Sequence, residues 1–172
     1  FVYDSYRRLI MMYADVVMEK ALGLNRSSCS IRELMEKELE SVKKVKGYKS
    51  DSNMKAKDWK ALSKKYLRMV KKEFGVPFPD DHYEQLFGAI AAVFESWNGK
   101  RAKEYRGFEK ISSSMGTAVN VQAMVFGNLG KDCGTGVAFT RNPSTGDNSF
   151  FGEFLINAQG EDVVAGTRTP QY

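Results

Sequence analysis

Residues 118–168 carry the pattern that decides the fold of this chain, and they read AVNVQAMVFGN (118–128), LGKDCGTGVAFTRNPSTG (129–146) and DNSFFGEFLINAQGEDVVAGTR (147–168). From Gly116 onward the hydrophobic period changes from 3.6 residues to 2, which is the period of a β-strand. Glycines separate the short alternating runs and permit tight turns and a close approach of the backbone to a ligand. The pattern is typical of a sheet that cradles a phosphorylated ligand.

Short strands are expected over residues 118–126, 135–140, 153–157 and 162–165. In the third run Phe154 and Ile156 share one face, while Glu153, Leu155 and Asn157 share the other. The sheet is therefore predicted to have one apolar face and one that is partly polar.

Residues 1–110 show helical periodicity and predict four main helices. The apolar stripes are Tyr6, Ile10, Tyr13 and Val17; Trp59, Leu62, Tyr66, Met69, Val70 and Phe74; and Leu86, Ile90, Val93, Phe94 and Trp97. A further helix is expected from the capping box at Ser30 to about Lys46, and Gly47 and Gly75 are expected to end helices. We therefore expect an α+β protein, with a helical lobe over residues 1–110 and a mainly antiparallel β lobe over residues 111–172.

The positive charge gathers in one segment. Residues 43–72 contain 12 Lys and Arg but only two acidic residues, Asp51 and Asp58. Such a stripe could bind nucleic acid. Because apolar periodicity runs through the same segment, the favoured interpretation is a solvated helix face, with no nucleic-acid partner.

No apolar run approaches the roughly 20 residues that a membrane-spanning helix needs, so no membrane partner is expected. A chain that starts at Phe1 without a visible signal peptide and stops at Tyr172 suggests a piece of a longer protein. Cys29 and Cys133 are interpreted as reduced thiols of an intracellular protein.

The β half offers the residue types that ATP binding requires. Gln122, Met124 and Val125 could form an edge for adenine, because methionine packs well on flat rings and a strand backbone can hydrogen-bond a base. Glu153 and Glu161 are candidate Mg²⁺ ligands, since Mg²⁺ prefers oxygen donors.

Neutral and cationic partners accompany those candidates. Asn157 and Gln159 could supply amide groups, and either Arg141 or Arg168 could stabilise charge on a transferred phosphoryl group. Each candidate has a structural alternative: a solvated polar face for Glu153 and Asn157, a turn with an ion pair for Arg141, core packing for Met124. Residues 160–162 could equally be a hairpin turn. His82, the sole histidine, is interpreted as a neighbour of a helix cap rather than a catalytic group.

Longer segments resemble one known family in the same order along the chain. These are Tyr3–Arg8 (YDSYRR), Ser96–Asn98 (SWN) followed by Arg101-Ala102 and Tyr105-Arg106, Gly116–Asn128, Gly134–Gly146 and Gly152–Pro170. They resemble the ATP-grasp-type nucleotide-binding domain of the pyruvate, phosphate dikinase family. The similarity is weakest over residues 22–80.

The resemblance implies an activity for the complete protein. Members transfer the β,γ-pyrophosphoryl unit of ATP to a carrier histidine on another domain, with Mg²⁺ required. A pyruvate-binding domain then forms phosphoenolpyruvate, so that ATP, phosphate and pyruvate give AMP, pyrophosphate and phosphoenolpyruvate. The family's glycine-rich segment with its phosphate-binding lysine, its carrier-histidine motif and its pyruvate-binding domain do not occur in this sequence. We therefore expect an internal fragment without turnover of its own.

The same resemblance implies roles for individual residues. Glu161 and Arg168 are expected to be catalytic, and Glu153 and Glu161 to bind metal. Gln122, Met124, Val125 and Gln159 are expected to contact the nucleotide. The complete enzyme is expected to be a homodimer in the cytoplasm or an organelle, either plastid or glycosome. Two alternatives stay open: a phosphoenolpyruvate synthase, and a non-catalytic module that binds through its basic helices.

Overall fold

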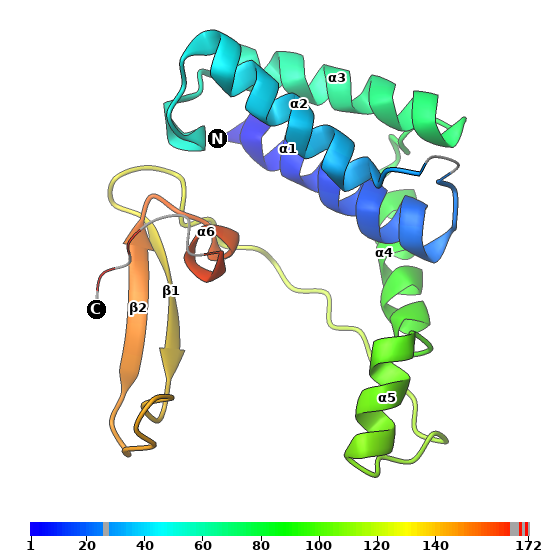
Figure 1. Ribbon diagram of the computed structural model, residues 1–172, viewed down its shortest axis with the longest axis vertical. Coiled ribbons are helices and arrows are strands. Elements are labelled where there is room, and N and C mark those ends of the chain that lie inside the picture. Colours follow the sequence, from blue (N-terminus) through cyan, green and yellow to red (C-terminus); the bar gives the residue numbers. More distant parts are fainter. Residues whose placement is uncertain (26–27, 166–168, 170, 172) are drawn as a thin grey trace. The chain divides into compact units, whose positions relative to one another are not determined.

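The computed structural model describes residues 1–25, 28–165, 169 and 171. The chain forms two compact units, one of residues 2–120 and one of residues 121–172 together with Phe1 (Figure 1). The predicted division into lobes after residue 110 falls in a region of turns and extended chain between Phe108 and Gly134. That boundary stays a prediction.

The first unit is helical. Its elements are α1 (Val2–Tyr13), η1 (Ala14–Ala21), α2 (Ile31–Lys46), η2 (Asp51–Asn53), α3 (Ala56–Phe74), α4 (His82–Ser96) and α5 (Lys100–Phe108). The helices predicted from Ser30, from the Trp59 stripe and from the Leu86 stripe are confirmed, whereas α5 is an additional helix. No helix among the described residues is long and apolar enough to cross a lipid bilayer.

The ends of these helices are set by local chemistry. Ser30 Oγ accepts a hydrogen bond from the backbone N–H of Glu33 at 3.2 Å, and Asp81 Oδ1 accepts one from Glu84 at 2.8 Å. Gly47 and Gly75 end α2 and α3 with φ of 70° and 77°, a conformation that glycine adopts without steric cost.

The segment η1 departs from the continuous α-helix that the stripe from Tyr6 to Val17 predicts. It is a π-helix of eight residues, and the N–H of Leu22 donates to the carbonyl of Val17 at 2.9 Å, five residues back. This spacing also suits a side-chain pair, because Lys20 Nζ lies 2.9 Å from a carboxylate oxygen of buried Asp15. Long π-helical stretches are rare, and residue patterns of period 3.6 do not indicate them.

The core of the first unit lies between α1, α2 and α3, which run side by side in Figure 1. The stripe predicted on α3 is buried as expected, with Tyr66, Val70 and Phe74 almost completely inaccessible. The Tyr66 hydroxyl donates to the Met35 carbonyl at 2.7 Å, and burial raises the pKa of Tyr66 well above its ordinary value. The bond satisfies the one polar group that this side chain brings into the core.

The stripe predicted on α4 is not a core stripe. Only Ala92 of this helix is buried, while Val93 and Phe94 are 43% and 48% exposed. Within the described residues α4 packs chiefly against η1. A helical hydrophobic period therefore identified the helix correctly but overstated its burial.

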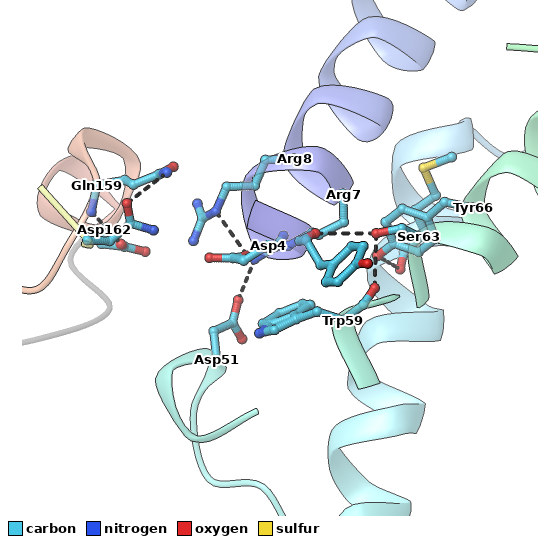
Figure 2. A network of polar contacts seen from close by, with 12 residues as sticks. Asp4, Arg7, Arg8, Asp51, Trp59, Ser63, Tyr66, Gln159 and Asp162 are labelled. Carbon is cyan, nitrogen blue, oxygen red and sulfur yellow. Dashed lines mark hydrogen bonds and ion pairs between the residues drawn. The ribbon is translucent and has the colours of Figure 1, made fainter. Parts of the chain in front are cut away.

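A buried arginine connects three elements of the first unit. Arg7 of α1 is 3% exposed; its Nε donates to Asp4 Oδ1 and its Nη2 to Asp51 Oδ2, both at 2.8 Å (Figure 2). The guanidinium also lies over the ring of Trp59 on α3, 4.6 Å from its centroid. A charge at this depth is tolerated because it is paired, hydrogen-bonded and stacked.

The second unit is built on a hairpin of β1 (Gly134–Phe139) and β2 (Phe151–Ile156), which are antiparallel with Gly136 opposite Phe154. The short helix α6 (Gly160–Val164) follows. Leu155, Ala158 and Val163 form its small core, with Val137 packed against them. The face of β2 predicted to be partly polar therefore packs on this core through Leu155, whereas Phe154 and Ile156 on the predicted apolar face are exposed.

Two of the four predicted strands are wrong. Residues 118–126 have no strand structure, because no described segment forms the ladder of hydrogen bonds that an extended chain needs to become a strand. Residues 162–165 lie in and just after α6. The Asp162 carboxylate accepts from the N–H of Gln159 at 2.8 Å, and this cap begins a helical turn.

We expect Arg7→Met to lower the free energy of unfolding by about 2–3 kcal/mol, because it leaves Asp4 and Asp51 without their shared cation while keeping the aliphatic volume. Urea denaturation followed by tryptophan fluorescence measures this, since Trp59 lies directly beneath the guanidinium. The matched control is Arg68→Met at an exposed position of α3, expected to change stability by less than about 0.5 kcal/mol. Equal stabilities for the two variants would contradict a structural role of Arg7.

Candidate functional site

The candidate site is the turn that joins β2 to α6, and backbone contacts hold it from two sides. Asn157 donates its N–H to the Cys133 carbonyl at 2.7 Å, and Ala158 donates its N–H to the Gly127 carbonyl at 3.0 Å. The Thr135 hydroxyl, at the start of β1, donates to the Ala158 carbonyl at 2.7 Å. Ala158 is completely buried, so the turn is fixed before any ligand binds.

Gly127 makes these contacts possible. A Cβ atom added to Gly127 would overlap the hydroxyl of Thr135 and the carbonyl oxygens of Ala158 and Gly134. The absence of a side chain lets the two turns lie backbone against backbone. In the sequence Gly127 is one of several turn glycines and gives no sign of this contact, because its partners are 7 to 31 residues away.

The start of α6 orders the polar residues of the turn. Gln159 is the N-cap of α6. Its backbone N–H donates to Asp162 Oδ2, as Figure 2 shows, and its side-chain Nε2 donates to Asn128 Oδ1 at 3.3 Å. Glu161 lies in the first turn of α6 and is exposed. Of the two adjacent carboxylates, Asp162 caps the helix and Glu161 faces solvent.

The predicted site residues lie in different settings. Gln159 and Glu161 are brought together at the start of α6. Glu153 lies in the middle of β2, half-buried and opposite Val137. Arg168 is outside the described residues.

The predicted adenine edge is not assembled with the others. Gln122, Met124 and Val125 lie in the segment without strand structure, where Met124 is 72% and Val125 94% exposed. None of the three lines the hollow found on the hairpin. The role of these residues in binding adenine stays a prediction.

Candidate metal ligands do not form a preassembled group. No three His, Cys, Asp or Glu side chains gather in a metal-binding cluster within the described part of the chain. Glu153 also lines a mostly apolar hollow on the hairpin, together with residues 136–138, 150–152 and 154. It is the only charged residue of that lining.

Arg141 and His82 have structural settings. Arg141 is exposed and donates from Nη1 to the Gly146 carbonyl at 3.1 Å, closing the loop between the strands. This agrees with the turn interpretation of Arg141, although its partner is a carbonyl rather than an acid. His82 is the first residue of α4, next to the cap Asp81, and its ring packs against that of Tyr83.

The basic segment is a helix face opposite the core. Lys57, Lys64, Arg68 and Lys71 are exposed along α3, while Lys65 is paired with Glu38 at 2.6 Å. This agrees with the solvated face favoured by the sequence. Binding of nucleic acid to it stays an untested alternative.

Comparisons with known proteins give a consistent result. Residues 78–172 match the family model described as "Pyruvate phosphate dikinase, AMP/ATP-binding domain". The chain is 52% identical over 171 residues to "Pyruvate, phosphate dikinase" of Rhizobium meliloti and 51% identical over 172 residues to that of Clostridium symbiosum. It is 50% identical over 171 residues to "Pyruvate, phosphate dikinase 1, chloroplastic" of Zea mays.

Each of these alignments covers 99% of the chain. The chain spans 18% of the length of the two bacterial relatives and 17% of the maize one. The family match includes β1, β2 and α6, and therefore the whole candidate site.

We expect Gly127→Ala to destabilise the second unit by about 3 kcal/mol, because the added methyl group must push apart the turns that Thr135 and Ala158 connect. Amide hydrogen exchange of β1 and β2 is the suitable measurement, since both tryptophans lie in the first unit. Gly130→Ala is the matched control, because a Cβ there meets open space. Similar exchange rates in the two variants would show that the close approach at Gly127 is not required.

Proposed function

The chain belongs to the pyruvate phosphate dikinase AMP/ATP-binding domain family, and from this we propose that it forms part of the ATP-binding domain of a pyruvate, phosphate dikinase. The observation that carries the proposal is the family match over residues 78–172, which contains the ordered turn at the start of α6. The identity of about half the residues over nearly the whole chain extends the support to the helical unit.

The proposed reaction of the complete protein has three steps. The β,γ-pyrophosphoryl unit of ATP passes to a histidine on another domain and AMP is released. The outer phosphoryl group is then transferred to phosphate, which gives pyrophosphate, and the remaining phosphoryl group reaches pyruvate. The overall conversion is ATP, phosphate and pyruvate to AMP, pyrophosphate and phosphoenolpyruvate. The partners of this chain are thus ATP and the phosphohistidine and pyruvate-binding domains of the same polypeptide. By itself the 172-residue chain is proposed to bind ATP weakly and not to turn over.

The chain's part in that reaction is to hold the nucleotide, in the ATP-grasp manner. Gln159 is proposed to hydrogen-bond ATP from the capped start of α6, where its backbone is already fixed. Gln122, Met124 and Val125 are proposed to contact adenine, an apolar surface with hydrogen-bonding edges. Arg168 is proposed to stabilise negative charge on the transferred group.

Mg²⁺ is the proposed cofactor, and the donors present suit it. Glu153 and Glu161 offer carboxylate oxygens, and Mg²⁺ is commonly bound through one or two carboxylates with substrate phosphates and waters completing its shell. When bound, Mg²⁺ neutralises phosphate charge and stabilises the charge that develops during transfer. Glu161 is exposed at the end of a fixed turn, so little reorganisation of the backbone is needed to present it.

The names of the relatives favour the dikinase over a phosphoenolpyruvate synthase, because each is called a pyruvate, phosphate dikinase. We further propose that the complete protein is a homodimer in the cytoplasm or an organelle; one maize relative is described as chloroplastic.

In the full-length enzyme, we expect Glu161→Ala to lower the rate of the ATP-dependent partial reaction by at least about 100-fold, because the variant lacks a proposed ligand of the Mg²⁺ that stabilises the transferred charge. The thermal midpoint is expected to change little because the side chain is exposed. Exchange of labelled AMP into ATP measures the partial reaction, because AMP is released when the pyrophosphoryl unit leaves ATP. Asp132→Ala, another exposed acid of this unit, is the control and is expected to retain activity. A Glu161→Ala enzyme with normal exchange would refute the assignment.

For the 172-residue chain alone, titration calorimetry is expected to detect weak ATP binding that strengthens when Mg²⁺ is added. The Glu161→Ala chain is expected to lose the Mg²⁺ effect while retaining its circular dichroism spectrum. Binding of equal strength with and without Mg²⁺ would show that this chain does not contribute to the metal site.

A further inference from the structure

The side chain of Gln159 contacts a residue for which the sequence predicts no role. Asn128 follows Gly127 in the turn after residues 118–126, and its Oδ1 accepts the hydrogen bond from Gln159 Nε2 at 3.3 Å. Both side chains are half-buried, and the two residues are 31 positions apart in the sequence. The contact therefore depends on the fold rather than on the local chain.

The backbone around Asn128 is held in place independently of that contact. The carbonyl of Gly127 accepts from Ala158 at 3.0 Å, immediately before Gln159, and Thr135 anchors the Ala158 carbonyl at 2.7 Å. Because Gly127 carries no side chain, Asn128 is brought within reach of Gln159. Both ends of the contact between Asn128 and Gln159 are thus fixed by backbone hydrogen bonds.

The remaining groups of Gln159 are then determined. Its N–H is bound by Asp162 Oδ2 at 2.8 Å, and its Nε2 by Asn128 Oδ1. In the capping box of α6 the side-chain oxygen of Gln159 also accepts a hydrogen bond from the backbone N–H of Asp162, so the amide is held at both its nitrogen and its oxygen. A carboxamide has a second N–H and a second oxygen lone pair, and holding it in one orientation lowers the entropic cost of binding a ligand through them.

We propose that Asn128 is a positioning residue of the nucleotide site, acting through Gln159 by fixing the orientation of its side-chain amide. This inference rests on the proposed function, since it assumes that Gln159 contacts ATP or its metal. Asn128 itself need not touch the nucleotide. Its removal should affect binding of ATP more than the chemical step, because a residue that orients a binding group contributes equally before and during transfer.

A double-mutant cycle in the full-length enzyme tests the proposal, using Asn128→Ala, Gln159→Ala and the double variant. The measured quantities are KM for ATP and kcat in the ATP-dependent partial reaction, and the thermal midpoint. We expect Asn128→Ala to raise KM about fivefold, as the loss of one neutral hydrogen bond does, with kcat within about twofold of the parent. In the Gln159→Ala background, the same substitution should change KM by less than about twofold.

Three results would overturn the proposal. The first is an unchanged KM in Asn128→Ala when Gln159→Ala raises it. The second is a full and additive effect of Asn128→Ala in the Gln159→Ala background, which indicates a purely structural role. The third is an unchanged KM in Gln159→Ala, which would show that Gln159 does not contact ATP. If Glu161→Ala is still inactive in that case, the proposed function of the enzyme stands although the role of Asn128 does not. If Asn128→Ala fails to fold, Asn128→Ser, a residue suited to turns but too short to reach Gln159, replaces it in the cycle.

Discussion

The second unit depends on the close contact of two backbones at Gly127. Without it, the Thr135 hydroxyl and the carbonyl of Ala158 could not pair, and the turn from β2 into α6 would lose its support on one side. That turn carries Gln159 and Glu161, so a residue without a side chain determines where two candidate site residues lie. The backbone groups of the turn are hydrogen-bonded to protein atoms, and these bonds fix the segment that presents Gln159 and Glu161.

The helical unit solves a different physical problem, that of keeping a positive charge inside a core. Arg7 is accommodated because Asp4, Asp51 and Trp59 surround it from three elements. Such an arrangement contributes little net stability compared with an apolar core but strongly penalises any packing in which the partners separate. The unit is shared with bacterial and plant relatives over its full length, although residues 1–77 lie outside the family model.

Local signals in the sequence predicted local structure well. Ser30, Asp81, Gly47 and Gly75 act on their neighbours within four residues, and the helices that they bound occur as predicted. The strand predicted over 118–126 fails for the opposite reason, because a strand requires a partner and alternation alone does not supply one. The π-helix was not predicted because its hydrogen bonds to the fifth residue leave the hydrophobic pattern almost unchanged.

The candidate site was only partly predictable on the same grounds. The resemblance to a family placed Glu161 and Gln159 in one functional segment, and the structure gives both a defined setting at the start of α6. Asn128 and Thr135 contact that turn across 31 and 23 residues, and no pattern in a single sequence encodes such a pairing. The hydrogen bond of Arg7 to Asp51, 44 residues apart, was invisible for the same reason.

The open edge of the hairpin has a consequence for aggregation of the protein. Within the described part of the chain, β1 has a strand on one side only, so backbone N–H and C=O groups on its other side are available to pair with another molecule. Phe139 on this strand and Phe150 beside the hairpin are exposed, and neither proline nor lysine occurs within β1 to discourage such pairing. Isolated copies are therefore prone to join edge to edge at high concentration. In the much longer relatives, additional chain is available to cover such an edge.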